Sequence, residues 1–145
     1  MTTMSLHDAR APIIVSHEGA LRFAAQIGPH RIIVDQPMRS GGEDGGPSPV
    51  DLLGASLGTC VAFYVQQFCH ARGLAYDGLR VEVEQEGARN PSRVGHFAVR
   101  VILPGQLPWP HGEMLERVAR SCPAHNTLTA GAEVTVVIES AVAVA

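Results

Sequence analysis

The chain contains 145 residues, of which 46% are apolar, 17% are charged and 5% are aromatic. This length predicts one domain over residues 1–145 with a single core, and the apolar content excludes an intrinsically disordered chain. The formal net charge is −3 and no run of basic residues occurs, which excludes a nucleic-acid-binding surface.

The opening segment MTTMSLHDARAP carries both signs of charge and lacks the apolar region of a secretory signal. We therefore expect a cytoplasmic protein, in which the three cysteines are thiols because that compartment is reducing. Residues 52–69 carry no charge, but their serine, threonine and glutamine side chains favour a buried helix over a membrane span. No membrane partner is expected.

Three short apolar stretches near the start predict a β-meander, over residues 13–15, 21–27 and 31–34. Turn signals separate them, the dipeptide EG before the second stretch and the tripeptide GPH before the third. Residues 37–47 are rich in glycine and proline and predict a loop with too little side chain to pack. Such a loop is either mobile or lines a site.

A long helix is predicted over residues 49–72. Ser48 is a suitable cap, Pro49 fits the first helical position, and Asp51 completes a capping box near the positive end of the helix dipole. Gly73 marks the end of the helix. One face carries apolar or small side chains at helical spacing: Leu53, Leu57, Cys60, Val61, Tyr64 and Phe68.

Alternating apolar and polar residues predict a β-hairpin in the second half of the chain. Its strands are expected over residues 79–86 and 96–103, each with one apolar face. The other face of the hairpin is polar, and Arg100 is expected to pair there with Glu82 or Glu84.

The C-terminal part of the chain predicts a second helix over residues 111–120 and a short helical segment over residues 123–128. A valine-rich stretch, residues 133–142, predicts a final strand. The predicted order is βββ-α-ββ-α-β, which belongs to the α+β class with the long helix at its centre.

The cysteines have different local settings. Pro123 disfavours a helical Cys122 and suits the start of a new turn, so Cys122 is expected at a helix N-terminus, where a thiolate is favoured. His125 could face the sulfur as a base or a cationic partner. Cys60 lies on the apolar face of the long helix, and this position suits either a small core residue or a reactive thiol. Cys69 falls on the opposite side of that helix and is expected to be structural.

Three motifs taken together resemble the OsmC/Ohr superfamily, in the branch with an SPxxLL helix start and a CPxH second motif. They are GPSPVDLL at residues 46–53, ASLGTC at 55–60 and CPAHNTL at 122–128. The resemblance covers nearly the whole chain in order. It implies a single OsmC-like domain and an intertwined homodimer, in which the long helices are buried against each other and two sites lie at the subunit interface.

The resemblance also implies a chemistry, the thiol-dependent reduction of organic hydroperoxides in oxidative-stress defence. Cys60 would attack the peroxide to give a sulfenic acid, and Cys122 would condense with it to a disulfide. An external dithiol would restore both thiols, and no cofactor is required. His125 and Asp51 are the expected supporting residues.

The sequence departs from the peroxidase members at the helix start. Those members carry a glutamate ten residues before the first cysteine, where this chain has Val50 followed by Asp51, and an arginine near the N-terminal strands with no clear counterpart here. This leaves open a non-peroxidatic protein that binds a small apolar or thiol-reactive ligand in the interface pocket.

A zinc site is a third interpretation. Cys60, Cys122 and His125 are suitable ligand types, but they are only three and their spacing matches no zinc-finger pattern. No metal is therefore expected.

Overall fold

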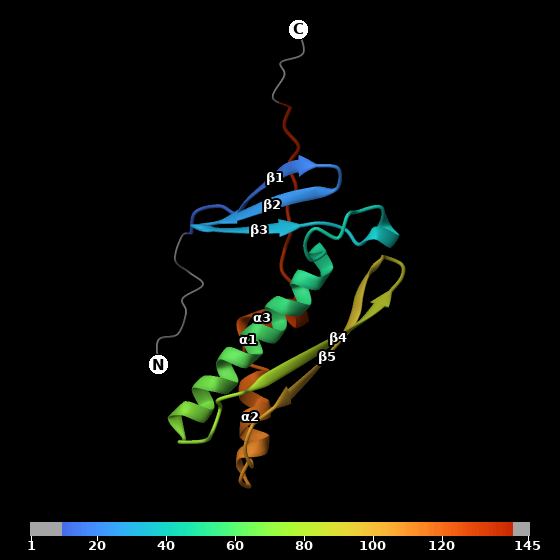
Figure 1. The fold of residues 1–145 in the computed structure, drawn as a ribbon. Helices are drawn as coiled ribbons and strands as arrows, with labels where there is room; N and C mark the ends of the chain where they lie inside the picture. Colours follow the sequence, from blue (N-terminus) through green and yellow to red (C-terminus); the bar gives the residue numbers. More distant parts are fainter. Residues whose placement is uncertain (1–9, 141–145) are drawn as a thin grey trace. The chain divides into compact units, whose positions relative to one another are not determined.

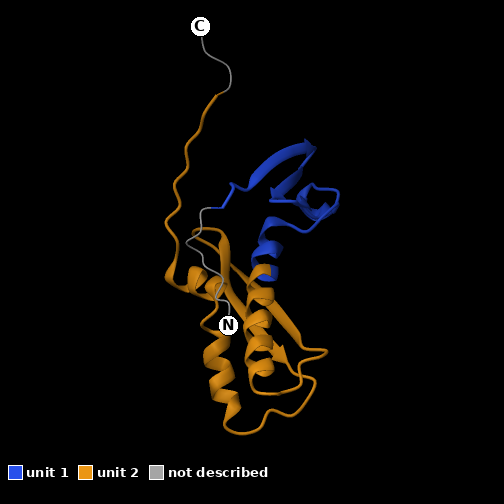
Figure 2. Cartoon of the chain, turned by 90° about the vertical axis from the view of Figure 1, so that its left-hand side faces the viewer, with its two compact units in different colours: residues 1–55 blue, residues 56–145 orange. Residues whose placement is uncertain are grey.

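The computed structural model describes residues 10–140, and they divide between two compact units. The first unit is Met1–Ala55 and the second is Ser56–Ala145 (Figures 1 and 2). The boundary falls within the long helix α1, Pro49–Ala71, whose first turns belong to the first unit. The two units are described separately, and the single domain over residues 1–145 stays a prediction.

The first unit contains a three-stranded antiparallel sheet in the order β1-β2-β3 (Figure 1). Its strands are β1 (Ile14–Gly19), β2 (Arg22–Ile27) and β3 (His30–Val34). Phe23 of β2 is paired with His17 on one side and with Val34 on the other. The predicted meander is confirmed; β1 extends further than expected, to Gly19, and its register with β2 shifts between His17 and Gly19.

The glycine-rich loop after β3 is organised by one buried carboxylate. Asp35 accepts hydrogen bonds from the main-chain N–H groups of Gln36 at 2.7 Å, Gly45 at 3.0 Å and Glu43 at 3.3 Å. The Gly45 bond is the largest cause that lowers the pKa of Asp35 below its ordinary value, against the opposing effect of burial. A loop with few packing side chains is thus held by main-chain contacts to a single residue, together with the short 3-10 helix η1, Met38–Ser40.

Helix α1 begins and ends as its sequence predicts. The Asp51 N–H donates to the Ser48 hydroxyl oxygen at 3.2 Å and the Ser48 N–H donates to the Asp51 carboxylate at 3.3 Å, which together form the capping box. The Ser48 hydroxyl also donates to this carboxylate at 2.6 Å. At the other end Gly73 has φ +65, and its N–H donates to the His70 carbonyl at 3.3 Å. The Leu74 N–H reaches the Cys69 carbonyl at 2.9 Å, which completes a Schellman motif.

The second unit contains a two-stranded antiparallel sheet of β4 (Arg80–Ala88) and β5 (Arg93–Ile102). Glu82 lies opposite Arg100 in the register, and the two side chains form the predicted ion pair on the exposed face. The hydrogen bond from Arg100 is the largest cause that lowers the pKa of Glu82, and the same bond raises the pKa of Arg100. The predicted hairpin is confirmed.

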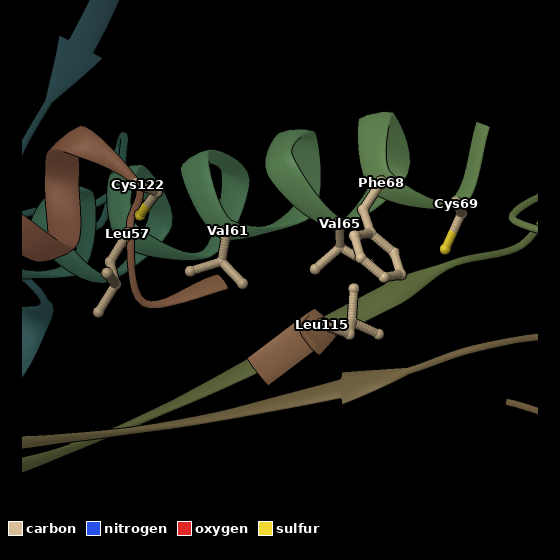
Figure 3. Close-up of a cluster of buried hydrophobic side chains, with 7 residues drawn as sticks. All are labelled: Leu57, Val61, Val65, Phe68, Cys69, Leu115 and Cys122. Carbon is tan, nitrogen blue, oxygen red and sulfur yellow. The ribbon is translucent and has the colours of Figure 1, made fainter. Parts of the chain in front are cut away.

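The core of the second unit lies between α1, the hairpin and the helix α2, His111–Ala119 (Figure 3). Gly58 allows α1 to approach β4, because a Cβ atom at this position would lie 2.9 Å from Val83 Cγ2. Leu53, expected on the buried face, is 48% exposed. The buried cluster consists of Leu57, Val61, Val65, Phe68, Cys69, Leu115 and Cys122.

Helix α1 is also the one helix in the described part of the chain that is long and apolar enough to be considered as a membrane span. Its best window has a mean hydropathy of 1.3, and 39% of that window is buried inside the structure. A core helix of a soluble protein meets the same criteria, so this is weak support for a membrane location. The cytoplasmic location stays a prediction.

The final strand is not found where the sequence predicts it. Residues 131–140 have no regular secondary structure, and the last two residues of the predicted strand, 141 and 142, lie outside the described residues. Val134 and Ile138 are 80% and 93% exposed. The alternating valines satisfy the local pattern of a strand, but a strand also needs a neighbour for its N–H and C=O groups, and no described strand pairs with this segment.

Candidate functional site

Cys122 caps the helix α3, Pro123–Ala130. Its backbone is extended, with φ −68 and ψ 146, and Pro123 occupies the start of the helix. The Cys122 Sγ accepts the main-chain N–H of His125 at 3.4 Å, and the Asn126 N–H donates to the Cys122 carbonyl at 3.0 Å. The predicted placement of Cys122 at a helix N-terminus is confirmed.

The Cys122 thiol is fully enclosed, with an exposed fraction of 0%. Its side chain points into the core of the second unit, near Leu57 of α1 (Figure 3). Burial is the largest influence on its pKa and raises it. The His125 N–H acts in the opposite direction, and the neighbouring Cys60 thiol adds to the rise. The thiol form of Cys122 is therefore favoured at neutral pH.

Cys60 lies near the middle of α1, half-buried, and packs against the core cluster that contains Cys122. Its thiol is close enough to the Cys122 thiol to raise the pKa of Cys122. Both cysteines are free thiols. Two residues that are far apart in the sequence thus lie near each other, as disulfide chemistry requires.

His125 contacts the Cys122 sulfur through its main-chain N–H. The role of its imidazole as a base or cation, which the CPxH spacing suggested, stays a prediction. The residue also lines a cavity in the second unit. The Nδ1 atom is buried and has no hydrogen-bond partner among the described residues.

The cavity has a volume of about 490 Å³ and its wall is mainly apolar. The wall includes two charged residues, Glu116 and Arg120, which pair with each other at 2.7 Å. This volume and chemistry suit a small apolar molecule. The remaining lining residues come from α1, β5, α2 and α3: Leu57, Val61, Phe97, Val99, Val101, Gly112, Leu115, Ala119 and His125.

Sequence reasoning named His125 only as a partner of the Cys122 sulfur, and it missed the β5 wall of the cavity. The inward positions of β5, among them Phe97 and Val99, were recognised only as the apolar face of a hairpin. Alternation shows which residues face inward, but it does not show whether they meet other side chains or leave a space. The cavity therefore became visible only in three dimensions.

Asp51 and Cys69 have structural contacts. Asp51 belongs to the first unit, where its carboxylate is held by the N–H and hydroxyl of Ser48. Cys69 is fully buried in the core cluster, and burial raises its pKa. Its environment agrees with the structural role expected for it.

The zinc interpretation finds no support in the geometry. Among residues 10–140, no three His, Cys, Asp or Glu side chains form a group that could hold a metal ion. Cys60, Cys122 and His125 therefore do not form the ligand set that this interpretation needs.

Comparison with known proteins identifies the fold and the family. The family model described as OsmC-like protein matches residues 41–137. No curated protein sequence gives a significant match to the chain.

Several solved structures have the same fold. A Psychrobacter arcticus protein, described in terms of osmotic stress induction and detoxification response, has a TM-score of 0.76 and 23% identity over 85% of this chain and 91% of its own. The Legionella pneumophila organic hydroperoxide resistance protein OsmC has a TM-score of 0.58 and 20% identity, over 84% of this chain and 92% of its own. A Vibrio cholerae protein named for organic hydroperoxide resistance holds captopril in one of its active sites. It has a TM-score of 0.55 and 15% identity, over 86% of this chain and 89% of its own.

Proposed function

The chain belongs to the OsmC-like family, and on this premise we propose that it is a thiol-dependent peroxidase that reduces organic hydroperoxides. One observation carries the proposal. The half-buried Cys60 packs against the core cluster that contains the fully buried Cys122, which caps a helix, and the Cys60 thiol raises the pKa of Cys122. A pair of neighbouring free thiols, one of them partly exposed, is suited to a two-cysteine redox cycle.

The reaction proceeds in two steps on the protein. The Cys60 thiolate attacks the terminal peroxide oxygen, the O–O bond breaks, and the alcohol leaves with a proton while Cys60 becomes a sulfenic acid. The Cys122 sulfur then attacks the sulfenic sulfur, and the disulfide forms with loss of water. Cys60 takes the first role because Cys122 is enclosed and has a raised pKa. An external dithiol reduces the disulfide.

The cavity supports an organic rather than an inorganic peroxide. Its apolar wall would hold the hydrocarbon part of the substrate, and His125 in that wall also donates its main-chain N–H to the Cys122 sulfur. Captopril in the Vibrio cholerae protein agrees with a site that accepts small organic molecules. His125 and Asp51 act as supporting residues, the first through its main-chain N–H and the second by fixing the start of α1.

The protein is proposed to function as a homodimer. The exposed valine-rich segment, residues 133–139, has the period of a strand but no strand partner among the described residues. Leu53 and Phe63 on α1 are 48% and 51% exposed. A second copy would cover both features. Light scattering of the wild type should give twice the mass of one chain. The Phe63→Glu variant should have the mass of a single chain. A monomeric wild type would contradict the proposal.

A peroxide-consumption assay with cumene hydroperoxide and a dithiol tests the activity. The wild type should consume peroxide, Cys60→Ser should be inactive, and Cys69→Ser should retain turnover because Cys69 does not contact the pair in this scheme. Full activity in Cys60→Ser would refute the assignment.

A non-peroxidatic binding protein is the second candidate. It is favoured by Val50, which stands where peroxidase members have an activating glutamate, together with the apolar cavity. Native mass spectrometry that detects a retained small ligand, combined with no peroxide turnover, would select this function over the first.

A further inference from the structure

A disulfide between Cys60 and Cys122 offers two sulfur atoms to a reductant, and the structure makes them unequal. Thiol–disulfide exchange depends on which sulfur is accessible and on how well the other sulfur leaves as a thiolate. The two cysteines differ in both respects. The question rests on the proposed function, because it concerns the step that returns the oxidised pair to its thiols.

We infer that the external dithiol attacks the Sγ atom of Cys60 and that Cys122 is the leaving thiolate, received by the main-chain N–H groups at the start of α3. The reductant thereby forms a mixed disulfide with Cys60, while the bond between Cys60 and Cys122 breaks. The second thiol of the reductant then attacks the reductant sulfur of that mixed disulfide and releases Cys60. The protein gains two electrons, and the dithiol becomes a disulfide.

Access selects Cys60. Cys122 has an exposed fraction of 0% and lies in the same buried cluster as Leu57 and Leu115. A thiolate must approach a disulfide along the line of the S–S bond, and the core side chains close that line at Cys122. Cys60 is only partly buried. An incoming sulfur therefore reaches Cys60 without opening the core.

The leaving group is favoured at Cys122. The His125 N–H lies 3.4 Å from its Sγ, and the main-chain N–H groups of His125 and Ala124 both act to lower the pKa of this thiol, which favours its charged form. The bond from Asn126 N–H to the Cys122 carbonyl, 3.0 Å, fixes this turn. Cys60 has no comparable donors, because N–H groups in the middle of α1 are engaged within the helix.

Burial acts against a lasting negative charge at Cys122, since it raises the pKa of this thiol. The thiolate that leaves is therefore short-lived and takes up the proton that the attacking thiol has released. The amide groups stabilise the charge during bond breaking, and the enclosed environment then favours the neutral thiol. Reduction in this direction ends with both cysteines in the state in which the structure shows them, as free thiols.

Trapping the mixed disulfide tests the direction of attack. The Cys69→Ala variant leaves one cysteine in each of two tryptic peptides, residues 40–72 with Cys60 and residues 121–145 with Cys122. Diamide forms the disulfide without peroxide. Reduced glutathione, a monothiol that cannot complete the exchange alone, is then added, the mixture is quenched with acid and N-ethylmaleimide, and the peptides are analysed by mass spectrometry.

Glutathione should be found on the Cys60 peptide in at least about tenfold excess over the Cys122 peptide, as the difference in access requires. Predominant attachment to Cys122, or equal attachment to both, would overturn the inference. The outcome is separable from the proposed function. If cumene hydroperoxide forms the disulfide but glutathione marks Cys122, only the direction is wrong. If neither diamide nor peroxide joins the two cysteines, both proposals fail.

The main-chain donors are tested by Ala124→Pro, which removes one N–H at a position near the helix start where proline is tolerated. In a Cys60→Ser background the pKa of Cys122, followed by thiolate absorbance, should rise relative to Ala124→Gly, which keeps the N–H. An unchanged pKa would remove the role assigned to the amides. This background also carries Cys69→Ala, so that Cys122 is the one thiol left to absorb and Cys60 no longer contributes to its pKa.

Discussion

The main-chain N–H of His125 lies 3.4 Å from the Sγ of Cys122, while the imidazole of the same residue lines a cavity. One residue therefore contributes to the helix cap through its backbone and to the cavity wall through its side chain. The two contributions can be separated by substitution, because only proline removes the backbone N–H.

His125→Pro is expected to lower the free energy of unfolding by about 1 kcal/mol more than His125→Ala, since the proline variant loses the cap as well as the ring. Urea unfolding of the reduced proteins measures the difference. Equal losses in the two variants would show that the N–H contact to the sulfur does not stabilise the fold.

Val99→Trp is expected to fill the cavity and to raise the KM for cumene hydroperoxide roughly tenfold, the factor that about 1.4 kcal/mol of lost apolar contact produces. Ala98→Trp is the matched control, because Ala98 lies on the opposite face of β5, beside the Glu82 and Arg100 pair. Steady-state kinetics of the two variants checks the prediction. A similar KM in both would mean that the substrate does not enter this cavity.

Gly58→Ala is expected to destabilise the protein by about 1 kcal/mol, as overpacking against β4 outweighs the gain in helix propensity. The added Cβ would lie 2.9 Å from Val83 Cγ2, which belongs to a stiff β-branched side chain. Val83→Ala should relieve the clash in the Gly58→Ala variant, so the two substitutions together should cost less stability than the sum of their separate effects in chemical unfolding experiments. A Gly58→Ala variant more stable than the wild type would show that the contact is relaxed at little cost.

Asp35 is expected to make the stability of the protein depend on pH in the acidic range. Its pKa in the folded state is lowered, so its contribution is complete above the ordinary value of 3.8 and is lost as the pH falls through the lower folded-state pKa. Urea unfolding at neutral pH and below pH 3.8 measures this loss. Asp35→Asn should be less stable than the wild type at neutral pH and should show a weaker decline in acid; an identical decline would place the acid dependence elsewhere.

Cys122→Ser is expected to stop the cycle after the first oxidation. The Cys60 sulfenic acid should accumulate on treatment with cumene hydroperoxide, because no thiol at position 122 can condense with it. Dimedone labelling followed by peptide mass spectrometry detects this species. Labelling of the wild type to the same extent would indicate that Cys122 does not resolve the oxidised state.

Elements with local causes could be predicted from the sequence. The capping box of Ser48 and Asp51, the stop at Gly73 and the cap at Cys122 each depend on residues within a few positions of one another. The pairing of Glu82 with Arg100 follows from alternation within one hairpin. Such features need no knowledge of the rest of the chain.

Features that depend on distant or external partners could not be predicted. The contact between Cys60 and Cys122 requires the packing of α3 onto α1, and it entered the sequence interpretation only through a family resemblance. The segment 133–140 has the pattern of a strand, but its state depends on a neighbour that the pattern does not specify. Sequence spacing says nothing of main-chain direction, so the contact of the His125 N–H with the sulfur was not predicted.

The uncovered valine-rich segment also bears on the handling of the protein in solution. A run such as VTVVI, with high β-propensity and no charge, is the type of sequence that recruits other chains into intermolecular β-structure. With Val136 80% and Val137 81% exposed, an isolated chain carries this hazard on its surface. Pairing with a second copy and aggregation therefore compete for the same backbone groups of this segment.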